Sequence, residues 1–314
     1  MLHTIEPLRE TLHGHFSRDL PPVLTIAPGD TVRFRTLPGG WNLEPRRTAR
    51  YEDQPRTFEP RDPVLDDGHA LCGPVAIRGA MPGMALAVRI DAVQVGGWGT
   101  TVIGGWQSEV NDRLGVSAEP GTYLLWTLDA EALLGQNQHG HRLPLRPFMG
   151  VMGVAPGEPG VHSTVPPRPT GGNIDCKELV AGSTLYLPIA VPGALFSTGD
   201  GHALQADGEV STTAIECPME WVDLTFDLRP DLHLTTPRAD TPVGWLTFGF
   251  HEDLDEAMFI ALDAMLDLMG ELHGLERREA LGLASLLVDL RITQIVNGVK
   301  GVHAVLPHGV LGTV

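Results

Sequence analysis

The sequence predicts a mainly β protein: a jelly-roll-like β-sandwich with an inserted small β-barrel-like region and a C-terminal α/β part. Two observations predict this class. The 37 glycines and 26 prolines make up about a fifth of the chain and recur between short runs of Val, Ile, Leu and Thr, which is typical of many strands joined by tight turns. Apolar residues with helical spacing occur only in the last quarter.

The clearest strands lie near the N-terminus. Residues 22–26 and 31–36 are expected to form a hairpin about the turn Pro28-Gly29-Asp30. In the second strand Val32 and Phe34 alternate with arginines, which predicts one buried and one solvated face. Further strands are expected at residues 75–77, 85–95, 121–128, 148–154, 184–191, 213–216, 222–228 and 291–296.

Two long stretches lack periodicity. Residues 37–67 are rich in Pro and Arg and are expected to form loops, and residues 157–170 form a connector without a packing pattern. The resulting division has three parts. It comprises a β-sandwich of residues 1–92 with 172–232 that carries the site, an inserted β region with a Pro-rich connector at 93–171, and an α/β part at 233–314.

Two helices are expected in the C-terminal part. Asp253 and Glu256 fit a capping box, and Gly270 or Gly274 can end the helix that follows. This helix is apolar on most sides and needs a second covering surface. That predicts a homo-oligomer, with complete burial within one chain as the alternative. A second helix at 276–290 is expected to bury four leucines: Leu283, Leu286, Leu287 and Leu290.

The composition excludes several classes of partner. Lys+Arg 22 against Asp+Glu 39 gives a net charge of −17, which argues against nucleic acid and an anionic membrane. No apolar run approaches the roughly 18 residues of a membrane span, and the first residues lack the apolar core of a secretion signal. The three cysteines, an odd number, fit reduced thiols in a cytoplasmic protein better than a disulfide framework.

A cluster of acidic residues among turn glycines is the strongest indication of a site. Asp200 and His202 are two residues apart, so on an extended segment both point to the same face. Asp207 and Glu209 repeat that spacing, and Asp175 follows the paired glycines of GGNID. An O,N pair facing an O,O pair suits Zn²⁺ or a harder divalent ion and leaves a carboxylate free as a base. The alternative is a solvated turn whose carboxylates bind backbone amides.

Other chemical motifs are weak or missing. There is no G-x-S-x-G elbow, phosphate-binding loop, Rossmann glycine fingerprint or HExxH helix in the sequence. Cys176 lies beside Lys177 and Glu178, but adjacent residues on a strand point alternately away from one another, which argues against a nucleophilic thiol. Of two His-x-His pairs, residues 139 and 141 are expected to be exposed, and residues 13 and 15 remain weak candidates for supporting a site.

Several collinear motifs point to a known family. GGNIDC, GSTLYLP, GALFSTGDGHA, ADGE and TAIE, together with PPVLTIAPGDTVRF, CGPVAIRGAMPG and RPFMGVMGVAP, resemble the acetamidase/formamidase family over nearly the whole chain. The resemblance implies hydrolysis of short amides to a carboxylate and ammonia on a mainly β scaffold with a bound divalent metal. The chain departs from the family pattern at Ala206, Cys176 and Met84, and its segment 45–61 matches no family motif, so the substrate can differ from acetamide or formamide.

Carried onto matching positions, the resemblance and the donor chemistry give each residue an expected role. The expected metal ligands are Asp175, Asp200 and His202, the expected catalytic carboxylates are Glu209 and Asp207, and the expected substrate-binding residues are Asn173 and Glu216. The donor set favours Zn²⁺, and Ca²⁺ is the alternative, against which the imidazole counts. A non-catalytic ligand-binding β-sandwich on the same scaffold is the alternative function.

Overall fold

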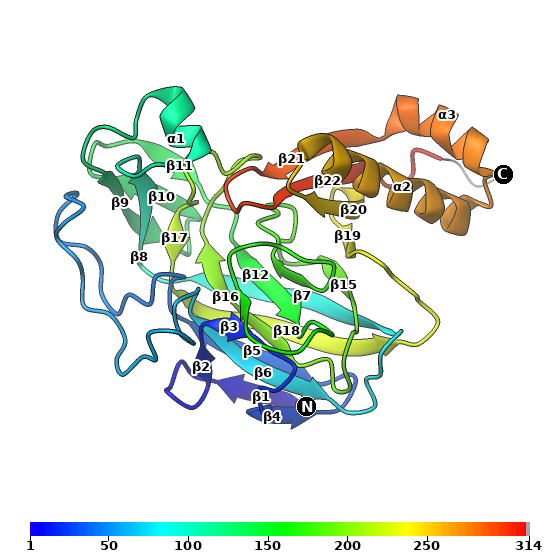
Figure 1. The fold of residues 1–314 in the computed structure, drawn as a ribbon, viewed down its shortest axis with the longest axis horizontal. Helices are drawn as coiled ribbons and strands as arrows, with labels where there is room; N and C mark the ends of the chain where they lie inside the picture. Colours follow the sequence, from blue (N-terminus) through cyan, green and yellow to red (C-terminus); the bar gives the residue numbers. More distant parts are fainter. Residues whose placement is uncertain (312–314) are drawn as a thin grey trace.

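The computed structural model describes residues 1–311, and two large β-sheets dominate it (Figure 1). The first sheet has nine strands, in the order β1-β5-β18-β7-β15-β19-β20-β22-β21. All neighbours are antiparallel except β1 and β5. The strands are β1 Leu2–Ile5, β5 Thr31–Thr36, β18 Met219–Arg229, β7 Ala85–Val95, β15 Thr184–Pro188, β19 Arg238–Thr241, β20 Gly244–His251, β22 Lys300–Leu306 and β21 Asp289–Gln294.

The second sheet has eleven strands. Its main order is β11-β10-β9-β8-β17-β16-β12-β14, and β6 pairs with β16 and carries β2 and β4. A separate short pair joins β13 to β3. The strands are β11 Arg142–Pro144, β10 Leu134–Asn137, β9 Thr122–Asp129, β8 Trp98–Ile103, β17 Glu216–Cys217, β16 Phe196–His202, β12 Phe148–Val154, β14 Gly171–Asn173, β6 Leu71–Ile77, β2 Leu12–His13, β4 Leu24–Ile26, β13 His162–Ser163 and β3 His15–Phe16.

The main core lies between these two sheets. Phe34 and Phe226 come from the first sheet and Phe196 from the second, and all three rings are fully buried. The ring centroids of Phe196 and Phe226 lie 5.0 Å apart in an edge-to-face arrangement, a favourable geometry for aromatic pairs. The mainly β class and the predicted burial of Val32 and Phe34 are therefore confirmed.

The predicted N-terminal hairpin is wrong, although both of its strands exist. β4 pairs with β6 in the second sheet, whereas β5 pairs with β1 and β18 in the first. The turn at Gly29 therefore crosses from one layer to the other. Alternation shows which face of a strand is buried but does not show its partner, and Ile26 and Phe34 reach the same core from opposite layers.

The expected three-part division stays a prediction, and both large sheets continue across its bounds. Strands β8 to β11 form an open antiparallel meander that extends the second sheet, so the β-barrel-like region is not a closed barrel within the described chain. Strands β19 to β22 likewise extend the first sheet. Figure 1 shows these two extensions on opposite sides of the sandwich, with α1 (Glu109–Leu114) beside the meander and the longer helices beside β20 and β22.

The sequence predicts the positions of the two C-terminal helices correctly, but it predicts only some of the residues that they bury. Helix α2 (Leu254–His273) begins after Asp253, whose carboxylate accepts from the backbone N–H groups of Asp255 and Glu256, and it ends at Gly274 in the left-handed conformation. Helix α3 (Arg277–Leu287) fully buries Ala280 and Ala284, and of the leucines predicted to be buried, Leu283 and Leu287 are partly buried against the same core. Leu286 is 79% exposed and Leu290, which belongs to β21, is 42% exposed, so their predicted burial is wrong. No helix within residues 1–311 is long and apolar enough to cross a bilayer.

Candidate active site

The second sheet and its loops gather four carboxylates and one histidine beside a cavity of about 360 Å³, which Asp200, Glu209 and Glu216 line. Asp200 and His202 lie at the end of β16, and Glu216 opposes His202 on β17. Asp175 follows β14, and Glu209 lies in the loop between β16 and β17. Asp175, Asp200, His202 and Glu209 are buried, and Glu216 is partly buried. Of the residues predicted to form a site, only Asp207 lies apart.

Distances within this group centre on His202. Its Nε2 atom lies 3.3 Å from Asp200 Oδ2 and 3.2 Å from Glu216 Oε1. Two sets of possible ligand atoms fall within 4.8 Å of one another and share this histidine. One set is Asp175, Asp200 and His202, and the other is His202, Glu209 and Glu216. The predicted ligand set is therefore assembled in space, and Glu216, predicted to bind substrate, also contacts His202.

The backbone at three of these carboxylates is strained. Asp175, Asp200 and Glu209 have φ angles of 53°, 57° and 45°, in the left-handed region that non-glycine residues rarely adopt. Each such residue costs of order 1–3 kcal/mol. This conformation turns Asp200 inward together with His202, and it separates Glu209 from Asp207. Three strained carboxylates at one cavity are typical of a functional site.

A glycine on the neighbouring strand makes room for the cluster. Gly150 lies on β12, which pairs with β16. A Cβ atom at Gly150 would lie 2.8 Å from Asp175 Oδ1, Asp200 Oδ2 and His202 Cε1. Any side chain at this position would enter the space that the three side chains enclose.

Two amides that the sequence analysis missed orient the cluster. Gln205 Nε2 donates to the backbone oxygen of Asp175 at 2.7 Å, so its Oε1 accepts from His202 Nδ1 at 2.9 Å. This bond directs Nε2 toward the carboxylates. Asn297, in the turn between β21 and β22, donates to Asp175 Oδ2 at 2.7 Å. Gln205 lies two residues after the motif GALFSTGDGHA, but Asn297 is 122 residues from Asp175 and no sequence signal links them.

The connector 157–170 also contributes to the cavity and is not structureless. Its strand β13 pairs with β3, and the buried Thr164 follows directly. The Thr164 hydroxyl accepts from the backbone N–H of His69 at 2.8 Å and lies 2.8 Å from its ring Nδ1. His69 lines the cavity, and its Nε2 lies 4.0 Å from Asp200 Oδ2. Thr164 and His69 are 95 residues apart, so no local sequence pattern indicates this contact.

The remaining candidates have other surroundings. Asp207 forms an ion pair with Lys177 at 2.8 Å and does not line the cavity. The Cys176 thiol is fully buried, and burial raises its pKa, which opposes a nucleophilic role. His13 binds Ser197 Oγ and the backbone oxygen of His15 inside the protein. His139 and His141 are exposed, as predicted.

Burial and mutual repulsion raise the pKa values of three of the site carboxylates. Burial raises the pKa of Asp175 to about 6 and that of Glu216 to about 8, and the Asp200 charge adds to both shifts. Burial, followed by repulsion from Asp175, raises the pKa of Glu209 well above its usual value.

The pKa values of Asp200 and His202 shift because these two groups attract each other. Burial opposes ionisation of Asp200, but His69 and His202 outweigh it and hold the pKa of Asp200 below its usual range. Burial likewise disfavours the charged imidazole of His202, but Glu216 and Asp200 outweigh it and raise the pKa of His202. Without a further cation, the cluster therefore has to retain protons.

Four buried polar atoms of this cluster have no hydrogen-bond partner within the described chain: Asn173 Oδ1, Asp175 Oδ1, His202 Nε2 and Glu209 Oε2. An unpaired buried polar atom costs about 1–3 kcal/mol, so four at one place indicate a missing partner. Carboxylate oxygens with an imidazole nitrogen suit a divalent cation. The residues Asp175, Asp200 and His202 therefore fit the expected metal.

Comparison with known proteins agrees with this geometry. The profile of the Acetamidase/Formamidase family matches residues 3–162 and 157–243. The chain belongs to the acetamidase/formamidase family. The crystal structure of an acetamidase from Bacillus halodurans, at 28% sequence identity, superposes with a TM-score of 0.82 over 97% of both chains. The mainly β fold is thus the fold of this family.

Two relatives found by sequence match over a smaller share of the chain. A protein of Schizosaccharomyces pombe provisionally named a formamidase is 30% identical over 64% of this chain. The acetamidase of Mycolicibacterium smegmatis is 26% identical over 69% of this chain. The matches span 60% and 65% of the length of these two acetamidase/formamidase relatives, respectively.

Proposed function

We propose that this protein hydrolyses short amides to a carboxylate and ammonia. The observation that carries the proposal is the set of four unpaired buried polar atoms at one cavity of an acetamidase/formamidase fold. A neutral amide is a poor electrophile with a poor leaving group, so its hydrolysis needs both carbonyl polarisation and proton transfer to nitrogen. The cluster offers groups for both.

Asp175, Asp200 and His202 would hold a divalent ion, for which we favour Zn²⁺ over Ca²⁺ because of the imidazole donor. Such an ion, when bound, polarises a carbonyl and lowers the pKa of water. Gln205 and Asn297 hold His202 and Asp175 in position for this role. Gly150 leaves the space between the three ligands open.

Glu209 is the proposed base. Its Oε2 atom is buried and unpaired beside Asp175 and His202, and its side chain lines the cavity. Glu209 would accept a proton from the attacking water as the new C–O bond forms and deliver it to the nitrogen as the C–N bond breaks. Asn173 donates its amide N–H to the backbone oxygen of Val165, which leaves Oδ1 free to accept from the substrate NH₂ group.

The direct test is ammonia release by purified protein from formamide, acetamide and propionamide. We expect turnover of at least one of these amides and its loss in Asp200→Asn, which removes a charge from the expected ligand set without changing the side-chain size. Absence of ammonia release from all three amides, with divalent metal supplied, would argue against the proposed reaction.

We also propose a homo-oligomer in a reducing, cytoplasmic setting. On α2, Phe259 is 58% exposed, and Leu281 of α3 lies beside the same hollow, which supports a covering second subunit. All three cysteines are free and buried. Light scattering at low micromolar concentration should give at least twice the chain mass. A mass near 33.8 kDa that stays the same on dilution would contradict the oligomer.

A further inference from the structure

The cavity is larger than the smallest amides require and has a cationic wall. Its 360 Å³ corresponds to roughly twelve waters at about 30 Å³ each, whereas acetamide has only four non-hydrogen atoms. Within the described chain, Arg61 is the one arginine or lysine that lines this cavity, and Asp67, Asp200, Glu209 and Glu216 give it an otherwise acidic lining. A single cation in such a cavity can fix the orientation of a ligand.

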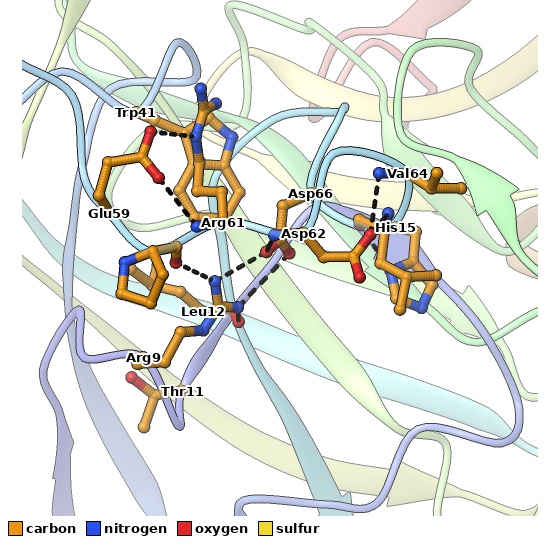
Figure 2. Close-up of polar contacts among 12 residues, drawn as sticks. Arg9, Thr11, Leu12, His15, Trp41, Glu59, Arg61, Asp62, Val64 and Asp66 are labelled. Carbon is orange, nitrogen blue, oxygen red and sulfur yellow. Dashed lines mark hydrogen bonds and ion pairs between the residues drawn. The ribbon is translucent and has the colours of Figure 1, made fainter.

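The Arg61 guanidinium packs against an aromatic ring, and its ion pair is too long to neutralise it fully. Its Cζ lies 5.5 Å from the centre of the buried Trp41 indole, a cation–π contact (Figure 2). Its ion pair with Glu59 is long, at 3.7 Å, and Glu59 is mostly exposed. Nε is buried without a hydrogen bond, and the terminal nitrogens make none within residues 1–311. The two terminal nitrogens therefore remain available to a ligand.

Hydrogen bonds hold the loop segment that follows Arg61. Asp66 accepts from Arg9 at 2.7 Å and from the backbone N–H of Asp62 at 2.9 Å, and Asp62 in turn accepts from two backbone N–H groups (Figure 2). Trp41 Nε1 donates to Gly68 O at 2.7 Å. A guanidinium positioned before the ligand arrives loses little freedom on binding, which favours affinity.

We propose that the substrate is a short amide that carries a carboxylate at the far end of its chain, and that Arg61 binds this carboxylate. The inference rests on the proposed amide hydrolysis and names its substrate class. The planar guanidinium matches a carboxylate in a two-bond geometry. Arg61 is the one arginine or lysine of the lining within the described chain, so a carboxylate bound there leaves the amide end to reach Glu209 and Glu216 on the same cavity.

The test compares succinamate with its neutral isostere, 4-oxopentanamide. Wild-type protein should show a kcat/KM about 10- to 100-fold higher for succinamate, the effect of one charge-assisted hydrogen-bonded pair. Arg61→Gln should bring this ratio close to one, and Arg61→Lys should give an intermediate ratio. The control is Arg56→Gln on the same loop. Arg56 is 71% exposed, does not line the cavity, and its replacement should leave the ratio unchanged.

A binding measurement separates this inference from the proposed reaction. Calorimetric titration with succinate should show binding that weakens at least about tenfold in Arg61→Gln. Arg61-dependent binding without ammonia release from any amide would support the ligand class and overturn the reaction. Hydrolysis with equal kcat/KM for the two amides, or with a preference for succinamate that survives in Arg61→Gln, would overturn the role of Arg61 and leave the reaction standing.

Discussion

Asp175 and Glu178 are two fully buried carboxylates only three residues apart, and their surroundings are opposite. Glu178 has two cationic partners, Arg146 and Arg291. Asp175 has no arginine or lysine partner within the described chain; one oxygen accepts from Asn297 and the other is unpaired. A buried carboxylate with arginine partners is satisfied by the fold itself. One without them shows where the fold has left room for another cation.

The same contrast separates Asp207 from Glu209. Asp207 is neutralised by Lys177 and points away from the cavity. Glu209, two residues later, is buried among other carboxylates with Oε2 unpaired. Sequence composition alone cannot distinguish these residues, whereas the location of the nearest cation does. We therefore assign function to the buried carboxylates that lack an arginine or lysine partner.

The largest expected effect is the loss of turnover in Glu209→Gln. The change is nearly isosteric and removes the proposed base, so turnover should fall by about two orders of magnitude or more. Ammonia release under saturating substrate, with metal content measured on the same sample, provides the test. Asp207→Asn is the matched control and should stay within about threefold of wild type. Equal loss of turnover in the two variants would contradict the assignment of the base to Glu209 and not to Asp207.

The next effect is on the free energy of unfolding, which should fall in Glu178→Gln but not in Asp175→Asn. Glu178→Gln leaves two arginines without their anion and should lower the free energy of unfolding by about 2 kcal/mol, less than for fully buried pairs because both arginines are partly exposed. Asp175→Asn removes repulsion and should leave the free energy of metal-free protein unchanged or increased. Urea denaturation after chelation measures both. Equal destabilisation by the two changes would show that Asp175 is structural.

The pH dependence of metal-free protein provides a finer comparison. Asp175 and Glu216 have pKa values of about 6 and about 8 in the folded state, above their unfolded values near 4. The folded state therefore binds more protons than the unfolded state. The contribution of these two groups to stability is fully present below about pH 4 and is lost as the pH rises through their folded values. The raised pKa of His202 acts in the same direction.

Thermal melts of chelated protein should therefore show a Tm that falls between pH 5 and pH 8. Glu216→Gln should flatten the upper part of this decrease, because it removes one group that titrates there. The same series for Glu178→Gln should keep the wild-type slope. A wild-type Tm that rises over this interval would contradict the proposed repulsion among the site carboxylates.

The smallest effect is expected for Cys176→Ser. The thiol is fully buried and its pKa is raised, so it is not the nucleophile. Turnover should stay within about tenfold of wild type, or about 1.4 kcal/mol in the barrier. Mass spectrometry of wild-type protein during turnover supplies the second check. Inactivity of the serine variant together with a trapped acyl-thioester on Cys176 would reverse this assignment.

Local features of the fold were predictable from the sequence, and pairing was not. Alternating and apolar runs gave the bounds of β5, β7 and β12 correctly, because burial on one or both faces leaves a pattern in the residues themselves. The partners of β4 and β5 were missed, since a turn between layers has the same residues as a turn within a sheet. Strands β20 and β22 were also missed.

The same limit applies to the site. Asp200 and His202 converge because both belong to strand β16, although the positive φ at Asp200 departs from the extended geometry that their spacing assumed. The identical spacing of Asp207 and Glu209 failed, because positive φ at Gly208 and Glu209 breaks the extended geometry on which the argument depends. Asn297 and Thr164 reach the site from distant segments, and only the folded chain brings them there.

The central claim is that the buried site carboxylates without an arginine or lysine partner hold a divalent ion. Elemental analysis of purified protein tests this claim most directly. We predict one divalent ion per chain in wild type, removal of both ion and ammonia release by chelator, and recovery of both when metal is returned. Asp200→Asn should lower the metal content, and Glu178→Gln should not. Well under one ion per chain, with ammonia release indifferent to chelator, would contradict the account.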